Sequence, residues 1–360
     1  MERFACNTRI LAGPGAVSAL AELGIQRLFV VTDPFFMKNG QAKAVAERAN
    51  AAQITFFDQV TPDPTVELVA EGTGLVRQFQ PDTVVALGGG SAMDCAKAMA
   101  YFSGLPIRLV AIPTTSGSGA EVTDFAILTH GGVKHPLVEE RLRPEVAILD
   151  SDLLASLPPA LVADAGFDIL AHAAEAVVAT GAGAVTDALA KDAFSVAFGA
   201  LPASFHGNGA VRQSIHTAAA MAGMAFSQAG LGLCHAMAHA LGGLFHVPHG
   251  RLNAILLPAV IDCNAYGAGA KYATLARAAG LGGSSDMMGV RNLKNGLVRL
   301  RRELQLPQTL QQAGVDPQEV WHKSGDIVDA ALADPCCKTN PVAVEAFMVR
   351  RVLEAVTGRG

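Results

Sequence analysis

Short apolar runs alternate with longer amphipathic segments over the first 157 residues of the chain. The runs are rich in β-branched and aromatic residues and predict strands, at 27–33, 54–60, 82–90 and 107–115. The segments between them repeat apolar residues at helical spacing and predict helices, at 41–52, 64–79 and 91–102. Strands that alternate with helices are typical of a doubly wound parallel sheet. We therefore expect residues 1–157 to form an α/β domain.

The pattern changes near residue 157. Beyond it the strand pattern disappears, and alanine-rich amphipathic segments separated by clusters of Gly, Pro and Ser continue to the C-terminus. This periodicity is typical of helices. We expect residues 158–360 to form a second, all-helical domain, and a length of 360 residues agrees with two domains.

Composition excludes several classes of function. The net charge is −5, and no run of Lys or Arg is present, which argues against a nucleic-acid or anionic-membrane surface. No apolar stretch reaches membrane-spanning length, and the N-terminus lacks the uninterrupted apolar run of a signal peptide. We therefore expect a cytoplasmic protein. Its six cysteines include no CxxC pair and are expected to be reduced thiols.

Two distant segments offer metal ligands at helical spacing. Asp168 and His172 are four residues apart, as are His235 and His239, and His249 follows the second pair. Residues at i and i+4 share one helix face. One carboxylate with imidazoles suits a divalent transition metal such as Fe(II) or Zn(II), and the oxygens are too few for calcium. The alternative is that these histidines only pack in the core or on the surface.

Three glycines connect the predicted strand at 82–90 to a predicted helix that begins at Ser91. They are Gly88, Gly89 and Gly90. Bare backbone N–H groups at a helix N-terminus suit a pyrophosphate, and side chains would block its approach. Asp94 and Lys97 lie one turn further along, where they can fix the loop or reach a nucleotide. The alternative is a tight turn without a ligand, and the GxGxxG fingerprint is absent because Met93 occupies its third glycine position.

Two further segments fit a dinucleotide. Asp33 ends a predicted strand about twenty residues after the glycines of AGPGAV, where an acid would bind the ribose 2′-hydroxyl of NAD. Asp33 could equally be a helix N-cap. Residues 113–123 form a segment of hydroxyls and glycines that can hydrogen-bond a sugar or phosphate, or simply turn. The remaining residues assigned to cofactor binding are Thr114, Thr115, Ser118, Thr123 and Lys134.

Five motifs together resemble the iron-containing, or group III, alcohol dehydrogenases. In chain order they are GGGSAMDCAK, PTTSGSGAEVT, GFDILAHAAEA, AGMAFSQAGLGLCHAMAH and PHGRLNAILLP, and they extend over essentially the whole chain. The resemblance implies an N-terminal Rossmann-like dinucleotide domain and a helical metal-binding domain. This is the fold shared with dehydroquinate synthase.

The resemblance also implies roles for individual residues. The metal ligands would be Asp168, His172, His235 and His249. His239 would then be the catalytic residue that faces the nicotinamide and the substrate, whereas Phe226 and Cys336 would line the substrate pocket. The chain departs from the family at Asp63, a position near the nicotinamide that is often Asn.

The implied activity is reduction of short-chain aldehydes such as propanal and acetaldehyde to primary alcohols, with NADH as hydride donor. Fe(II) is the expected metal and Zn(II) the alternative. The chain resembles propanol and ethanol dehydrogenases of bacterial microcompartments, which implies NAD regeneration beside microcompartment enzymes or the shell. A homodimer or larger homo-oligomer is expected. A glycerol-type polyol dehydrogenase, a dehydroquinate-synthase-like lyase and a non-catalytic metal-loaded scaffold remain the alternatives.

Overall fold

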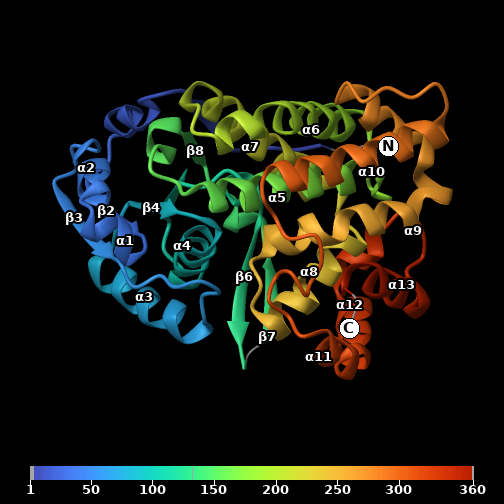
Figure 1. Cartoon of the computed structure of the whole chain (residues 1–360). Coiled ribbons are helices and arrows are strands. Elements are labelled where there is room, and N and C mark those ends of the chain that lie inside the picture. Colours follow the sequence, from blue (N-terminus) through green and yellow to red (C-terminus); the bar gives the residue numbers. More distant parts are fainter. Residues whose placement is uncertain (1–3, 132, 359–360) are drawn as a thin grey trace. The chain divides into compact units, whose positions relative to one another are not determined.

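The chain divides into two compact units. The computed structural model describes residues 4–131 and 133–358. One unit is Ala5–Leu157, and the other runs from Pro158 to the C-terminus and includes Phe4. Every strand of the described chain lies in the first unit, and the second is built of helices (Figure 1). The predicted fold class is therefore confirmed.

A six-stranded parallel sheet forms the centre of the first unit. The strand order is β1-β8-β5-β4-β2-β3. The bounds are β1 Arg9–Ala12, β2 Arg27–Val31, β3 Gln53–Phe57, β4 Thr83–Gly88, β5 Arg108–Pro113 and β8 Val146–Leu149. All five strand pairings are parallel. The four predicted strands are β2, β3, β4 and β5.

Alternate strand residues face two separate hydrophobic cores. Phe29 and Val31 of β2 pack on one side with α3 and α4, whereas Leu28 and Val30 pack on the other with α2 and the 3-10 helix η1. Both faces are covered, so the strands are apolar throughout, as is usual for parallel sheets. The helices of this unit are α1 Pro34–Lys38, α2 Gln41–Glu47, α3 Val66–Phe79 and α4 Gly90–Ser103, with η1 at Ala16–Leu23.

The sheet changes direction between β2 and β4. The chain passes from β2 to β3 on one side of β2, and then returns to place β4 on the other side. In open α/β sheets, ligands bind at the carboxyl ends of the strands that flank such a switch point. Asp33 follows the carboxyl end of β2, and Gly88 is the last residue of β4. The topology therefore brings the two predicted dinucleotide segments together.

Four strands of the described residues were not predicted from the sequence. β1 and β8 each have four residues, and β6 (Phe125–His130) pairs with β7 (Val133–Val138) as an antiparallel hairpin. Most of β7 is exposed and it contains Pro136, so it lacks the apolar alternation that identifies a half-buried strand. The remaining 3-10 segments of this unit are η2 Ala120–Val122, η3 Glu140–Leu142 and η4 Ser151–Leu154.

Helix α5 is the buried centre of the second unit. Every residue of Gly166–Val178 is buried, and α5 packs against α6, α7, α8 and α9. At Gly166 a Cβ would come within 2.3 Å of Leu201, so glycine permits the close approach of α6. The helices are α5 Pro159–Val178, α6 Ala184–Phe205, α7 Arg212–Ala229, α8 Leu233–Phe245, α9 His249–Ala278, α10 Asp286–Glu303, α11 Pro317–His322, α12 Ser324–Ala333 and α13 Ala346–Val356. The 3-10 segments are η5 Gly209–Val211 and η6 Pro335–Thr339.

Pro258 lies inside α9 and is compensated by an arginine. Proline lacks the N–H that would bond the carbonyl four residues earlier, which is that of Ala254. The buried Arg301 donates from Nη1 to the carbonyls of Ala254 and Ile255, at 2.9 and 3.1 Å. The first two turns of α9 therefore stay continuous with the rest, and they carry His249 and Asn253.

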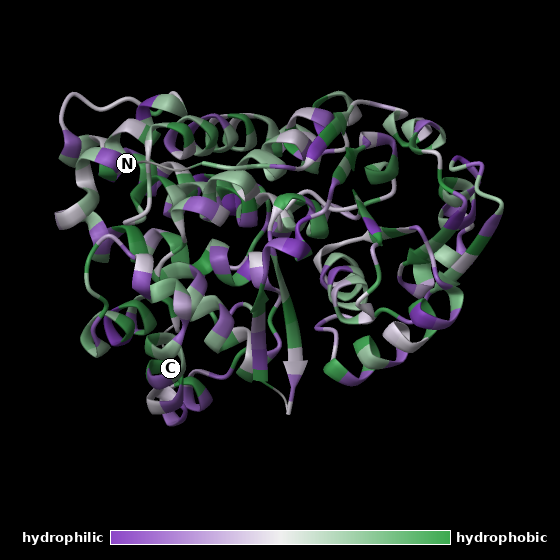
Figure 2. Cartoon of the chain, turned by 180° about the vertical axis from the view of Figure 1, so that it is seen from behind, coloured by the Kyte–Doolittle hydropathy of each residue, from purple (hydrophilic) through white to green (hydrophobic). Residues whose placement is uncertain are grey.

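Hydrophobic and hydrophilic residues are interleaved along most helices (Figure 2). Such helices pack one apolar face and leave the other to water. Among the helices of residues 4–131 and 133–358, none combines the length and apolar character needed to cross a membrane.

Candidate functional site

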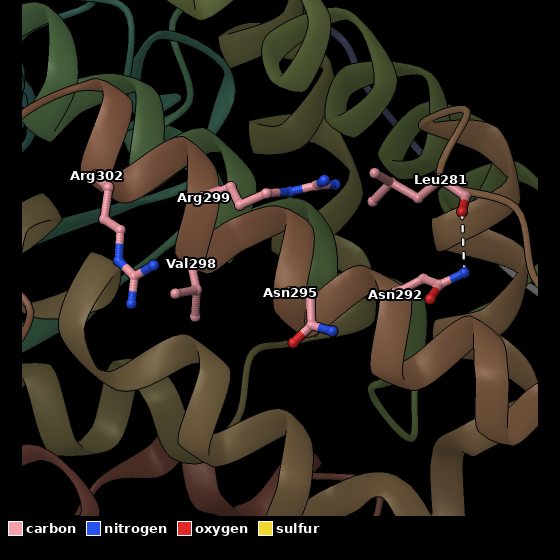
Figure 3. A pocket seen from close by; sticks show the side chains of 6 residues that line it. All are labelled: Leu281, Asn292, Asn295, Val298, Arg299 and Arg302. Atoms are coloured by element: carbon pink, nitrogen blue, oxygen red, sulfur yellow. Dashed lines mark hydrogen bonds between the residues drawn. The ribbon is translucent and has the colours of Figure 1, made fainter.

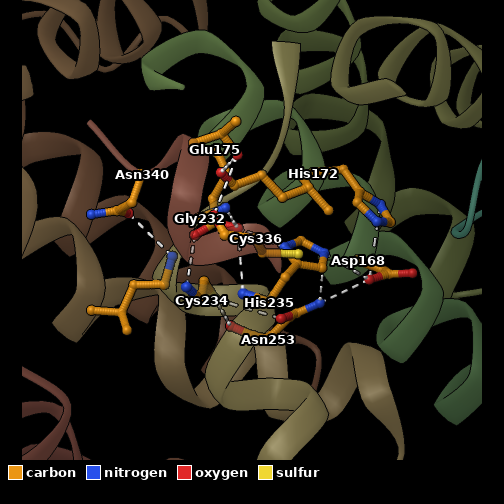
Figure 4. Close-up of polar contacts among 12 residues, drawn as sticks. Asp168, His172, Glu175, Gly232, Cys234, His235, Asn253, Cys336 and Asn340 are labelled. Atoms are coloured by element: carbon orange, nitrogen blue, oxygen red, sulfur yellow. Dashed lines mark hydrogen bonds and ion pairs between the residues drawn. The ribbon is translucent and has the colours of Figure 1, made fainter. Parts of the chain in front are cut away.

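Three helices each present a polar pair at i and i+4 to one place in the second unit. The pairs are Asp168 and His172 on α5, His235 and His239 on α8, and His249 and Asn253 on α9. Figure 4 shows the side chains of Asp168, His172, His235 and Asn253 pointing to this place. The sequence predicted five of these six residues. Asn253 was missed, although it follows His249 at the same spacing.

Asp168, His235 and His249 form a convergent set that could hold a metal ion. Asp168 Oδ1 lies 3.5 Å from His249 Nε2 and 3.9 Å from His235 Nε2. Ligands at metal–ligand distances of about 2.0–2.2 Å in a tetrahedral site stand about 3.4 Å apart. The observed spacing therefore fits a divalent transition metal after a small inward movement of the side chains.

The fourth predicted ligand, His172, lies beside this set. Its Nδ1 is 3.9 Å from Asp168 Oδ1. Its ring is stacked between those of Phe226 and His235, at centroid distances of 4.3 and 4.5 Å. Phe226 is buried and packs on His172, so the residue predicted to line the substrate pocket also holds a predicted ligand in place.

Glu175 fixes the orientation of His235. Its carboxylate Oε2 is 2.7 Å from His235 Nδ1, to which we assign the ring proton. The other nitrogen, Nε2, is then unprotonated and faces Asp168, as metal-binding histidines require. Glu175 also accepts backbone hydrogen bonds from Gly232, Cys234 and His235, at 2.9, 2.7 and 3.3 Å. It thereby caps α8, whose N-cap, Gly232, has no side chain of its own.

The ionisation states of these groups suit metal binding. Burial lowers the pKa of both His235 and His249 well below the ordinary value, so both imidazoles are neutral. Burial works to raise the pKa of Asp168, but the three imidazoles and the Asn253 amide outweigh it and lower that pKa. Burial raises the pKa of Glu175 to about 7, and its backbone donors oppose the rise.

Asn253 connects the three convergent ligands. Its Nδ2 donates to Asp168 Oδ1 at 2.8 Å and lies 3.3 Å from His235 Nε2 and 3.2 Å from His249 Nε2. Asn253 is completely buried. An amide there holds Asp168 on the side of the two imidazoles, so Asn253 supports the geometry of the site.

A second polar cluster adjoins the first. The ring of His239 stacks on that of His249 at 5.2 Å. His239 Nδ1 lies 2.8 Å from Asp334 Oδ2, and Asp334 Oδ1 accepts from the backbone N–H of Cys336 at 2.8 Å. Burial would raise the pKa of Asp334, but the hydrogen bond and charge of His239 prevail and lower it to about 2. Asp334 was missed, because it lies in a turn between α12 and η6 and shares no helical spacing with the histidines.

In the first unit, the glycine loop has the geometry of an anion site. Gly88 has φ +154°, and a Cβ there would come within 2.6 Å of Ala92. At Gly89 and Gly90 a Cβ would meet only Thr115 and Ser118, at 3.4 and 3.5 Å, so these two positions keep their backbone accessible. The N-cap of α4 has no side-chain hydrogen bond, and no acidic residue occupies its first turn, where Ser91 lies. The N-terminal N–H groups and dipole of α4 therefore favour an anion.

Asp33 lies next to this loop and is also a helix N-cap. Its Oδ1 accepts from the backbone N–H groups of Phe35 and Phe36, at 2.9 and 3.2 Å. Its Oδ2 lies 3.9 Å from the place that a Cβ would take on Gly88. The N-cap reading is therefore correct, and one carboxylate oxygen is left on the side of the glycine loop. Thr114 donates its N–H to the Gly88 carbonyl at 2.9 Å, which joins the segment at 113–123 to the same loop.

The other predicted cofactor residues lie beneath or beside that segment. Thr123 is completely buried, and its hydroxyl accepts from Lys97 Nζ at 3.0 Å. Asp94 is hydrogen-bonded to the backbone of Ile127, and burial raises its pKa to about 7. Lys134 pairs with Asp63 at 2.6 Å. Thr123 and Asp94 thus support the segment in this structure, and Lys134 is held by the residue that departs from the family.

A separate hollow lies along α10 (Figure 3). Its lining residues are Leu281, Asn292, Asn295, Val298, Arg299 and Arg302. They include no carboxylate, histidine or thiol, so this hollow offers no ligand set for a metal. None of the predicted site residues lines it.

Comparison with known proteins identifies the family. Residues 7–151 match the family described as iron-containing alcohol dehydrogenase. Residues 162–357 match the Fe-containing alcohol dehydrogenase family, C-terminal. The chain therefore belongs to the Fe-containing alcohol dehydrogenase family, as its motifs suggested.

Individual relatives agree with this assignment. The chain is 39% identical to a 1-propanol dehydrogenase PduQ of Citrobacter freundii, over 98% of this chain and 99% of the relative. It is 36% identical to an NADPH-dependent butanol dehydrogenase of Clostridium saccharobutylicum, over 99% and 98%. The structure resembles sulfoacetaldehyde reductase from Bifidobacterium kashiwanohense in complex with NAD+, with a TM-score of 0.89 at 26% identity over the whole of both chains. The predicted enzyme class, a nicotinamide-dependent alcohol dehydrogenase that contains a metal, is confirmed.

Gly232 provides a test of the Glu175 contact. A Cβ at this position would lie 2.6 Å from Asn340 Oδ1 and 2.9 Å from Glu175 Oε1. We expect Gly232→Ala to displace the carboxylate from His235 and to lower metal affinity by about 10–100-fold. The measurement is a metal titration against a chelator, together with the urea midpoint.

Gly243→Ala, in the same helix, is the matched control. A Cβ at Gly243 meets nothing within 4 Å, and alanine favours a helix by about 1 kcal/mol. This variant should keep its metal and gain stability. Similar metal affinity in both variants would show that the Glu175 contact does not set the ligand geometry.

Proposed function

We propose that this alcohol dehydrogenase reduces short-chain aldehydes such as propanal and acetaldehyde to primary alcohols, with NADH as its cofactor. The convergence of Asp168, His235 and His249, with the proton on His235 fixed by Glu175, is the observation that carries the proposal. The relative named 1-propanol dehydrogenase supports a small unbranched substrate.

The proposed metal ligands are Asp168, His172, His235 and His249. Their single carboxylate and neutral imidazoles leave a divalent ion with a net positive charge. We propose Fe(II) as the metal, in agreement with the family, and the same donors would also accept Zn(II).

The proposed cofactor residues lie at the carboxyl ends of β2, β4 and β5. The glycine loop from Gly88 to Gly90 and the first turn of α4 at Ser91 would bind the pyrophosphate. Asp33 would accept hydrogen bonds from the adenosine ribose. Further contacts would come from Thr115 and Ser118. Thr114 is buried and would support them through its hydrogen bond to the Gly88 carbonyl.

Metal and NADH, when bound, supply the Lewis acid and the hydride. The remaining task, delivery of a proton to the developing alcohol, falls to this chain. His239 in its doubly protonated form is the proposed donor: Asp334 would hold the Nδ1 proton, Nε2 would deliver its own proton, and the ring stacks on that of His249. Asp334 is a positioning residue, since it keeps a proton on Nδ1 and leaves delivery to Nε2. Phe226 and Cys336 are proposed to limit the size of the substrate.

Association with microcompartment enzymes or a shell, cytoplasmic location and assembly into a homodimer or larger oligomer stay predictions.

Cofactor choice tests the proposed function directly. An NADP phosphate against Asp33 would place like charges about 4 Å apart, which repel by about 4 kcal/mol at an effective dielectric of 20. We expect anaerobic, iron-loaded protein to oxidise NADH with propanal and to prefer NADH over NADPH by up to about a thousandfold, less after screening. Turnover is followed by the loss of nicotinamide absorbance.

Asp33→Ser is the informative variant, because serine keeps an N-cap acceptor for Phe35 and removes the charge. This variant should have a smaller preference for NADH over NADPH, mainly because its KM for NADPH falls. Equal use of both cofactors by the wild type, or an unchanged ratio in the variant, would confine Asp33 to its N-cap role. Absence of turnover with any short aldehyde would contradict the proposed substrate class.

Removal of one ligand tests the metal site. His249→Ala should lose metal and turnover but still bind NADH, because the proposed nucleotide loop belongs to the other unit. His246→Asn is the control, since His246 is exposed, lies three residues away and adopts φ +54°, which Asn tolerates. Metal content is measured by elemental analysis and NADH binding by fluorescence. Equal metal loss in both variants would mean that the segment has unfolded.

His239 and Asp334 test the proton step. His239→Ala should keep metal and NADH and lower kcat by about 10²–10⁴-fold, as expected for a lost general acid–base group. Asp334→Asn should also lower kcat, but by less than His239→Ala does. Its effect on the KM for NADH should be smaller than its effect on kcat. A near-normal kcat in His239→Ala would assign this histidine to packing alone.

A further inference from the structure

Three different metal-binding groups meet beside the proposed metal centre, and none belongs to its ligand set. They are His239 on α8, Asp334 at the N-cap of η6 and Cys336 in η6. One ligand atom from each lies within 4.8 Å of the ligand atoms of the other two. The cluster combines an imidazole nitrogen, a carboxylate oxygen and a thiol sulfur.

The chemistry of these donors selects the kind of ion. Thiolate and imidazole favour Zn²⁺ and related transition ions, whereas Mg²⁺ and Ca²⁺ require oxygen ligands. One carboxylate and one thiolate neutralise a divalent charge. The His239 side chain is 31% exposed and that of Asp334 is 14% exposed, so an ion can reach the cluster.

We propose that His239, Asp334 and Cys336 form a second, inhibitory site for Zn²⁺. The ion would bind the Asp334 carboxylate, Nδ1 of His239 and the sulfur of Cys336. Starting from neutral His239, the thiol proton of Cys336 passes to solvent and the ring proton moves from Nδ1 to Nε2. One proton is therefore released for each ion bound.

Occupation of this site would stop turnover. A His239 ring that binds zinc through Nδ1 could deliver its Nε2 proton only by becoming an anionic imidazolate, whereas the zinc-free ring delivers that proton from the cation. This inhibitory effect rests on the role proposed above for His239. The existence of the site does not, since it depends only on the three donors.

Cobalt distinguishes the two sites by absorption. The proposed primary centre holds only oxygen and nitrogen donors, so a thiolate-to-cobalt charge-transfer band can arise only from a cysteine-containing site. Full-length protein already loaded with one equivalent of Co²⁺ is titrated with more. We expect a second equivalent to bind and the band to grow with it.

Cysteine variants assign the band. Cys336→Ser should bind one equivalent and show no band. Cys337→Ser is the matched control and should behave as the wild type, because the Cys337 thiol donates to the Ala331 carbonyl at 3.0 Å and is not a member of the cluster. The proposed site would be overturned by any of three results: the wild type binds no second equivalent of Co²⁺, the band persists in Cys336→Ser, or the band is lost equally in both variants.

Kinetics test the inhibition. Zn²⁺ is added to iron-loaded enzyme that turns over propanal and NADH, and each variant is compared with its own zinc-free rate. We expect the apparent inhibition constant for Zn²⁺ to be at least tenfold higher in Cys336→Ser than in the wild type. Zinc that only replaces iron would inhibit the wild type and Cys336→Ser equally, and that result would overturn the inhibitory role. Protein without any turnover would contradict the proposed function, and the cobalt band would still decide whether the site exists.

Discussion

The buried carboxylate of Glu175 is the interaction on which the helical unit's site depends. It accepts three backbone hydrogen bonds at the start of α8 and a fourth from the ring of His235. A buried charge is costly unless donors surround it, and here the donors are the otherwise unbonded N–H groups of a helix end. The same contact therefore satisfies the carboxylate, begins the helix and leaves one nitrogen of His235 free for a metal.

The position of Glu175 on α5 connects this contact to the rest of the site. Asp168, His172 and Glu175 are spaced by four and three residues, so they share one face of a helix that is buried over Gly166–Val178. Any shift of α5 would move the carboxylate ligand and the N-terminus of α8 together. The close approach of α6 at Gly166 and the arginine that compensates Pro258 in α9 hold the neighbouring helices in register with this face.

Helical spacing in the sequence was enough to predict which polar pairs converge, and apolar runs followed by glycines were enough to find four strands of the sheet and the glycine loop. The sequence could not identify the groups that support them. Asn253 and Glu175 lie at helical spacing from ligands, but nothing in a single sequence tells a buried acceptor or donor from a solvated one. Asp334 reaches His239 from a turn, and only tertiary packing brings them together. Lys97 was open to a role at the nucleotide and is instead buried, where it supports Thr123.

The ligands of the proposed centre come from helices whose positions in the chain are far apart. Asp168 and His249 are separated by about 80 residues, so in an unfolded chain bringing them together would carry a large loop-closure entropy. An ion held by both acts as a reversible cross-link within the helical unit. Its binding free energy adds to the stability of the fold in proportion to the logarithm of the free metal concentration. If these residues are the ligands, the amount of metal in the surroundings would set how firmly this unit is folded as well as how much of it can catalyse.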